Sequence, residues 1–211
     1  MEERRAEEQP RRRSDGERTH AAILDTAMRL ASVEGLGSLT IGRLAKELGV
    51  SKSGVFAHFR SKERLQLETL AAAGEVFERE VLEPGLKAAP GLARLQALCE
   101  AHLSYIQRGV FPGGCFFAQV LAEYDAVSGP IHDEVADGQG GWFGLLEQEA
   151  RTAQQAGELA AGVDPVQLVF ELAAPVELAN YLSVLNRDPR FVERGRRAVR
   201  ERLAQAATSP A

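Results

Sequence analysis

Apolar side chains recur along most of this chain at intervals of three and four residues, the spacing of an amphipathic α-helix. Glycine and proline interrupt the pattern repeatedly and mark the ends of the predicted helices. We expect helices over residues 17–34, 41–48, 52–59, 62–83, 92–107, 115–124, 131–156, 165–185 and from 189 onward. No strand is evident, so the pattern predicts an all-α protein of about nine helices.

The stretch 40–62 predicts two short helices joined by a tight turn. Thr40 and Ser51 can cap them, because a hydroxyl oxygen accepts a hydrogen bond from a first-turn N–H group. Gly49 can adopt the left-handed conformation that ends the first helix. The second helix would present a small, polar surface with Lys52 at its N-terminal end, which suits the major groove of DNA. A helical hairpin with one basic end is the simpler alternative from the apolar pattern alone.

The candidate DNA contacts in this stretch share small size or the ability to donate to a phosphate oxygen. They are Thr40, Arg43, Lys52, Ser53, Gly54, Phe56, His58 and Lys62. Lys62 also opens the next predicted helix, where free N–H groups and the positive end of the helix dipole attract anions.

The run LTIGRLAKELGVSKSGVFAHFRSKERL, preceded by a predicted helix over 23–33 and the turn GLGSL, resembles the DNA-binding domain of the TetR family of bacterial transcriptional regulators. The resemblance covers about the first third of the chain in detail, and the helical remainder is similar in length and layout. It implies a homodimer on double-stranded operator DNA, with a phosphate contact from His58. Phe56 departs from the family, because many members carry a tyrosine there whose hydroxyl donates to phosphate. Phe56 can instead contact a thymine methyl group or a sugar edge.

These observations divide the chain into three parts. Residues 1–16 are rich in Arg and Glu and predict a disordered arm, residues 17–62 a three-helix helix-turn-helix DNA-binding domain, and residues 63–208 a larger helical domain for ligand binding and dimerisation. Arg11–Arg13 could reach a minor groove, although a solubilising tail is the simpler interpretation. The helix over 62–83 joins the two domains and would transmit ligand binding to the DNA contacts.

The net charge of −5 is unevenly distributed. Residues 1–67 hold 13 Lys or Arg against 10 Asp or Glu, and the remainder holds 12 against 20. Attraction to phosphate depends on where charges lie, so the basic N-terminal third is compatible with DNA binding.

Aromatic side chains gather in the larger predicted domain and indicate a cavity for a small apolar or aromatic inducer, with ordinary core packing as the alternative. The predicted lining is Phe77, His102, Tyr105, Phe116, Gln119, Glu123, Trp142 and Phe170. Within the helix over 131–156, the run QGGWFG has low helix propensity and predicts a kink or partial opening.

The helix over 165–185 is apolar on nearly two faces, so it needs two partners. We expect it to pair, together with the last helix, with its copies in a second subunit. The predicted interface residues are Leu172, Val176, Leu182, Phe191 and Val199. A thicker core within one chain is the alternative.

Other classes of protein find less support. The four histidines show no metal-ligand spacing, no Gly-rich phosphate loop follows a strand, and no GxSxG turn is present, so we expect no enzyme, cofactor or metal. The absence of a long apolar run or signal segment predicts a cytoplasmic protein without membrane contact. A helical scaffold for protein partners remains one alternative. A thiol-based redox regulator is another, because Cys115 lies at a predicted helix start where N–H groups lower a thiol pKa, with Cys99 as its partner.

The sequence therefore predicts a ligand-responsive transcriptional regulator, a repressor released from a near-palindromic operator by an inducer that it does not identify.

Overall fold

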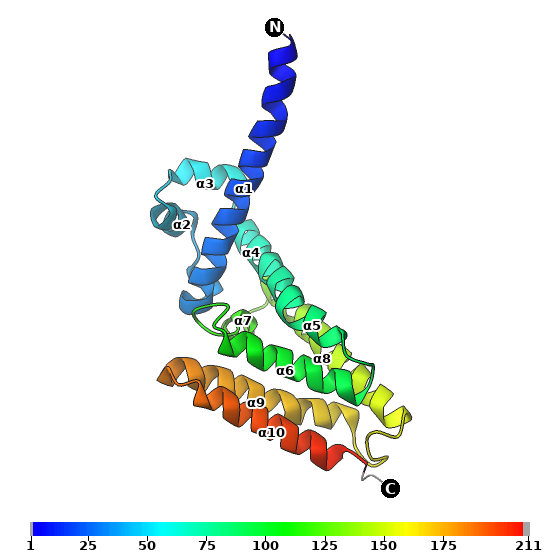
Figure 1. Ribbon diagram of the computed structural model, residues 1–211. Helices are drawn as coiled ribbons and strands as arrows, with labels where there is room; N and C mark the ends of the chain where they lie inside the picture. The colour runs from blue at the N-terminus through cyan, green and yellow to red at the C-terminus, as the bar shows by residue number, and fades with distance from the viewer. Residues whose placement is uncertain (1, 209–211) are drawn as a thin grey trace. The chain divides into compact units, whose positions relative to one another are not determined.

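The structure, a computed structural model, describes the backbone of residues 2–208 and the side chains of residues 16–208. Its long elements are all helices (Figure 1), namely α1 Glu2–Glu34, α2 Ile41–Leu48, α3 Lys52–Phe59, α4 Lys62–Phe77, α5 Glu83–Leu86, α6 Leu92–Gln107, α7 Phe116–Tyr124, α8 Pro130–Gln155, α9 Pro165–Asn186 and α10 Arg190–Ala206. A 3-10 turn over Leu36–Ser38 lies between α1 and α2, and a π-helical turn over Glu78–Leu82 connects α4 to α5 without a break. Counting that run as one, residues 2–208 form nine helices, which confirms the all-α prediction.

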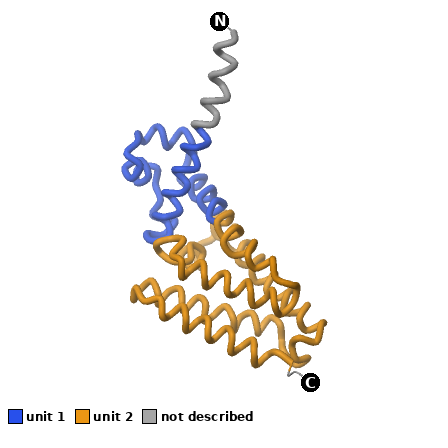
Figure 2. Tube along the Cα trace, in the orientation of Figure 1, with its two compact units in different colours: residues 1–73 blue, residues 74–211 orange. Residues whose placement is uncertain are grey.

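The chain forms two compact units, residues 1–73 and residues 74–211 (Figure 2). The division falls inside α4, after Ala73, whereas we predicted the domain boundary at Lys62. One continuous helix therefore contributes its first three turns to the smaller unit and its last turn to the larger one.

The first helix begins before Glu17, where the sequence placed its start, because α1 spans Glu2–Glu34. This differs from the disordered arm predicted for residues 1–16. The side chains of Arg11–Arg13 lie outside the described residues, so their contact with DNA stays a prediction.

The smaller unit has a core where α1 supports the helical pair α2 and α3. Ala27 and Ala31 of α1, Leu44 of α2, and Val55 and Phe59 of α3 are completely buried. Small alanines allow the α1 backbone to approach the pair closely, while Leu44, Val55 and Phe59 fill the space between the helices.

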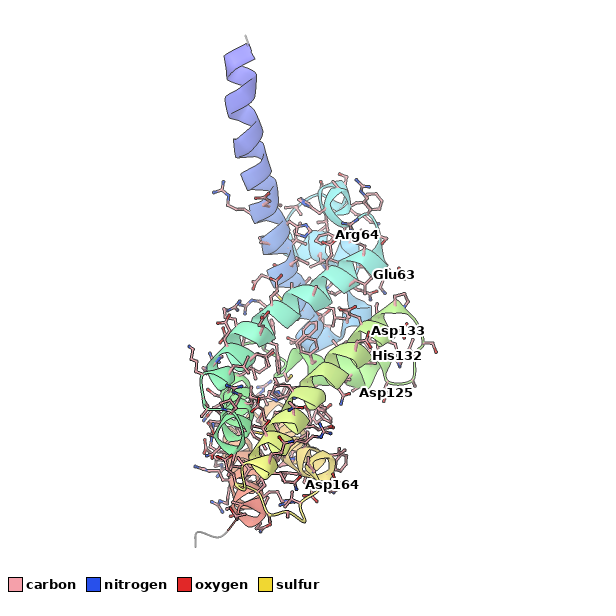
Figure 3. All side chains as sticks on the ribbon, turned by 90° about the vertical axis from the view of Figure 1, so that its right-hand side faces the viewer. Glu63, Arg64, Asp125, His132, Asp133 and Asp164 are labelled. Atoms are coloured by element: carbon pink, nitrogen blue, oxygen red, sulfur yellow. The ribbon has the colours of Figure 1, made fainter. Side chains whose placement is uncertain are left out.

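The larger unit is built around α6, α9 and α10. The last two lie side by side along their length (Figure 1), and both also pack against α6. Gly195 of α10 permits their close approach, because a Cβ atom there would lie only 2.8 Å from Ala179 Cβ of α9. Asp164 caps α9 (Figure 3), its Oδ1 accepting the N–H of Val166 at 2.9 Å.

Two buried polar side chains fix the loops of this unit. Asn180 of α9 accepts the N–H of Cys115 at 2.8 Å and so positions the start of α7. Glu149 of α8 accepts the N–H of Gly91 at 2.8 Å and pairs with Arg94, which holds the start of α6. Each satisfies a backbone group that burial would otherwise leave unpaired.

Candidate DNA-binding surface and ligand cavity

The helical pair α2 and α3 is capped as its sequence predicts. Thr40 Oγ1 accepts the N–H of Arg43 at 3.0 Å, and Ser51 Oγ accepts the N–H of Gly54 at 3.1 Å. Gly49 ends α2 with a φ of 67°, in the left-handed region that glycine favours. Local hydrogen bonds therefore set the turn that orients α3.

One face of α3 is buried and the other is open. The open face consists of side chains that are polar or small, apart from one ring: Lys52, Ser53, Gly54, Phe56 and Ala57. Phe56 is 52% exposed, an unusual position for a ring with no partner to cover it. The Lys52 side chain forms no hydrogen bond or ion pair within the described residues, and its stem lies over Gly42 of α2. This face can approach another surface closely.

Arg43 forms two ion pairs within the smaller unit. Its Nη2 lies 2.8 Å from Oε1 of Glu34 and its Nη1 lies 2.6 Å from Oε2 of Glu47. Hydrogen bonds to these two carboxylates raise the pKa of the Arg43 guanidinium, and the bond from Arg43 lowers the pKa of Glu34. The guanidinium thus links α1 to α2, and the predicted contact of Arg43 with phosphate stays a prediction.

Lys62 and His58 are also engaged within the smaller unit. Lys62 Nζ donates to the carbonyl of Gly37 at 2.6 Å, which ties the start of α4 to the 3-10 turn. The half-buried His58 ring lies 5.6 Å from the His20 ring and 6.2 Å from the Phe59 ring. Their predicted roles at phosphate stay predictions, and both residues have structural roles as well.

Two cations that sequence analysis omitted lie beside α3. Lys46, on α2, and Arg60, directly after α3, are exposed, and neither side chain forms an ion pair or hydrogen bond among the described residues. Arg60 adopts a φ of 61°, which is uncommon for a residue with a side chain. Their position next to the turn was a sequence signal that we did not use.

The larger unit contains a cavity of about 420 Å³ whose walls come from α4, the π-helical turn, α6, α7, α8 and α9. The walls are mainly apolar, with His102, Gln139 and Glu177 as polar side chains. The aromatic residues of the lining are Phe77, Phe117, Trp142 and Phe143. The Phe77 ring meets two of the others edge to face, with its centroid 5.3 Å from that of Trp142 and 5.8 Å from that of Phe117.

Three of the eight predicted lining residues, Phe77, His102 and Trp142, line this cavity. Tyr105 and Phe116 are fully buried in the adjoining aromatic cluster and do not reach it. The remaining three predicted residues are not part of the lining; they are Gln119, Glu123 and Phe170. Phe170 is 64% exposed on the outer face of α9, so its assignment to the cavity is wrong.

Two glycines of α8 form part of the cavity wall. We expected a kink or opening at QGGWFG, but α8 runs without a break from Pro130 to Gln155. Gly138 and Gly141 line the cavity, and a Cβ atom at either would meet nothing within 4 Å. Both residues are exposed, so this part of the cavity wall lacks side chains.

Burial shapes the ionisation of the cavity walls. His102 is 6% exposed, and its Nε2 is buried with no hydrogen-bond partner among the described residues. Burial lowers the pKa of His102 to about 4, so the imidazole is neutral at pH 7. Burial raises the pKa of the Glu177 carboxyl, which forms no ion pair or hydrogen bond within the described part of the chain.

The two cysteines do not match the redox alternative. Cys99 and Cys115 are both buried, and burial raises the pKa of each thiol to about 12. We expected helix N–H groups to lower the pKa of Cys115, so the expected direction is wrong. Desolvation of the thiolate outweighs those groups, and a protonated, buried thiol is a poor nucleophile.

The predicted dimer interface falls partly inside the chain. Leu172, Val176 and Val199 are at most 3% exposed within a single chain, so their assignment to the interface is wrong. They fill the core between α9, α10 and their neighbours. Leu182 and Phe191 are half-buried, and their place in the interface stays a prediction.

A different face of α9 is open. It carries four large apolar side chains spaced by eight, three and four residues. These spacings are close to whole helical turns and place the side chains along one side of the helix: Phe170, Leu178, Tyr181 and Leu185. We call these four residues the α9 stripe. Their exposed fractions are 64, 58, 45 and 78%. By length and composition alone α9 could span a membrane, but its other side is packed in the core of this unit, mainly against α10.

Comparison with known proteins places both units in one family of proteins. Residues 23–69 match the model described as bacterial regulatory proteins, tetR family, and residues 91–199 match the tetracyclin repressor-like C-terminal domain. The HTH-type transcriptional regulator AcrR of Shigella flexneri is 36% identical over 53 residues, a match that spans 25% of this chain and 25% of that protein.

Solved structures share the whole fold. A TetR transcriptional regulator from Chloroflexus aurantiacus superposes with a TM-score of 0.84 at 22% identity, covering 92% of this chain and 98% of that one. A transcriptional regulator from Saccharomonospora viridis, solved in complex with choline, superposes with a TM-score of 0.73 at 25% identity, covering 92% and 100%.

Proposed function

We propose that this chain, which belongs to the TetR family of bacterial regulatory proteins, is a homodimeric repressor that leaves a near-palindromic operator when a small molecule enters its cavity. Regulators of this family are ligand-responsive DNA-binding proteins. The observation that carries the proposal is the open face of α3 with its exposed Lys52, together with two further exposed cations, Lys46 and Arg60. None of the three has a partner in the described residues. Such a protein acts where bacterial DNA lies, in the cytoplasm.

The open face of α3 suits insertion into a major groove. Gly54 has no side chain and Ala57 only a methyl group, so the α3 backbone can come close to the base edges. Phe56 offers apolar contact to a thymine methyl group, and Ser53 offers a hydroxyl to a base or phosphate. Lys52, at the first position of α3, adds its charge to the positive end of the helix dipole, where a phosphate binds best. Lys46 and Arg60 supply further phosphate contacts.

The contact of α3 with DNA is tested by the salt dependence of binding. Lys52→Ala removes one phosphate contact per subunit, so the slope of log K against log salt should become shallower by about 2 in a dimer. Lys87→Ala is the control, because it removes the same charge from an exposed position in the larger unit. An unchanged slope in Lys52→Ala, or an equal change in Lys87→Ala, would show that α3 does not lie along the phosphates.

Dimerisation would bring two recognition helices to one operator. A single eight-residue helix such as α3 can contact only a few base pairs, whereas a two-fold pair reads two half-sites about 34 Å apart. The α9 stripe supports such a pair, because monomeric proteins rarely leave a row of large apolar side chains exposed. A two-fold contact places the same stripe on both sides of the interface.

Ligand release would act through α4. Phe77 and Gly74 of this helix line the cavity, and the same helix supplies residues 62–73 to the smaller unit. A ligand that fits the cavity better in a form unsuited to the operator would shift the population towards that form. The S. viridis regulator, which shares this fold, was solved in complex with choline, and this supports ligand binding by the present chain. The apolar walls favour a small apolar or aromatic body.

A further inference from the structure

The cavity lining contains an acidic side chain but no basic side chain that is charged at pH 7. The lining includes a single carboxylate, Glu177, and no lysine or arginine. The lining histidine, His102, is kept neutral by burial and therefore cannot balance that carboxylate. An anionic ligand would meet Glu177 with no cation to oppose it, so the cavity disfavours anions.

Glu177 itself lacks a partner. It lies on α9, forms no hydrogen bond or ion pair among the described residues, and its pKa is raised by burial alone. Glu177 is half-buried, and a partly desolvated carboxylate without a partner costs stability. A ligand with a positive group beside Glu177 would supply the missing partner, and this would offset the loss of stability.

The remaining walls suit the rest of such a ligand. Phe77, Phe117, Trp142 and Phe143 present aromatic surface, and ring faces attract cations through their quadrupole. The neutral His102 is a second polar contact, since its Nε2 is buried in the wall without a partner and can accept a hydrogen bond from an ammonium N–H. The tautomer that leaves this nitrogen free to accept carries its proton on Nδ1.

We propose that the inducer is an apolar organic amine that binds in its protonated form, with its ammonium group beside Glu177 and His102 and its hydrocarbon or aromatic body against the rings of the cavity. This inference rests on the proposed function, because it names the chemical class of the ligand that the same cavity takes. Glu177 acts as counter-ion to the ammonium group.

The test compares three probes with one skeleton and different charge: 4-phenylbutylamine, 4-phenylbutanol and 4-phenylbutanoate. Trp142 is the only tryptophan of the sequence and lines the cavity, so its fluorescence reports occupancy in the full-length protein without DNA. Titration calorimetry gives the same dissociation constants independently. We expect the amine to bind about tenfold more tightly than the alcohol, and the carboxylate to bind most weakly.

Glu177→Gln should abolish the preference for the amine and leave the affinity for the alcohol within about twofold of the original. Glu134→Gln, an exposed position on α8, is the matched control and should behave like the unaltered protein. Equal binding of amine and alcohol by the unaltered protein, or a preference that survives Glu177→Gln, would overturn the inference and leave the proposed repressor intact. If none of the three probes binds, the cavity is not the inducer site, and the ligand-release part of the proposed function fails with the inference.

Discussion

Leu178→Asp should separate the homodimer into monomers. Leu178 is 58% exposed near the middle of the α9 stripe. Complete burial of a leucine side chain is worth about 2–3 kcal/mol, so covering the exposed part of this one contributes about 1.5 kcal/mol. A two-fold interface contains the residue twice, which raises its contribution to about 3 kcal/mol. Loss of that contribution weakens the dimer by more than about a hundredfold, before the desolvation of two carboxylates is added.

Sedimentation equilibrium over a range of concentrations measures this change directly. Val127→Asp is the control, because Val127 is 51% exposed in the segment between α7 and α8 and lies outside the α9 stripe. Leu178→Ala separates loss of apolar contact from the introduction of charge, and should weaken the dimer less. The interface is elsewhere if Leu178→Asp dimerises as tightly as the unaltered chain, or if Val127→Asp weakens the dimer equally.

Three further predictions concern the larger unit. Asn180→Ala leaves the buried N–H of Cys115 without its acceptor, so urea denaturation should show a loss of about 1–3 kcal/mol in the free energy of unfolding. His102 has a folded-state pKa of about 4 and an unfolded value of about 6.5, so stability is fully present above pH 6.5 and falls by about 3 kcal/mol towards pH 4. This part of the acid sensitivity should be absent from His102→Gln, and its persistence would contradict the assignment. Gly141→Leu should reduce uptake of the neutral dye N-phenyl-1-naphthylamine by filling the cavity, whereas Gly140→Leu, one residue away and outside the lining, should not.

The helices and their ends could be predicted because their causes are local. Thr40, Ser51 and Asp164 cap helices through side chains that reach the next two or three residues, and Gly49 ends α2 by its own backbone conformation. None of these features depends on the rest of the fold. The spacing of apolar residues then identified most of the buried faces of the smaller unit.

The outward and inward faces of α9 could not be separated in this way. Leu172 and Leu178 are the same residue type, yet one is 1% exposed and the other 58%. Both belong to a helix apolar on two sides, and only the position of α10 decides which side is covered. A prediction from hydrophobicity alone therefore assigned core residues to the dimer interface, and it assigned the exposed Phe170 to the cavity.

Side-chain partners distant in sequence also lay beyond prediction. Arg43 was assigned to phosphate because its charge is in the right stretch, but Glu34 at the end of α1 comes within 2.8 Å of it. The cavity depends likewise on Glu177 of α9 facing the same space as the lining residues of α8, which lie more than thirty residues before it in the chain. The exposed Lys46 and Arg60 could have been included, since both flank the predicted turn.

The central claim is that two copies of α3, held together through α9, select one DNA sequence. Its most direct measurement is a competition binding assay in which the purified protein is offered the DNA upstream of its own gene and random fragments of equal length, at physiological salt. The account predicts a dimer that binds one near-palindromic site at about 10⁻⁸ M or tighter and prefers it to the random fragments by about a thousandfold or more. A protein that remains monomeric and binds every fragment equally would contradict it.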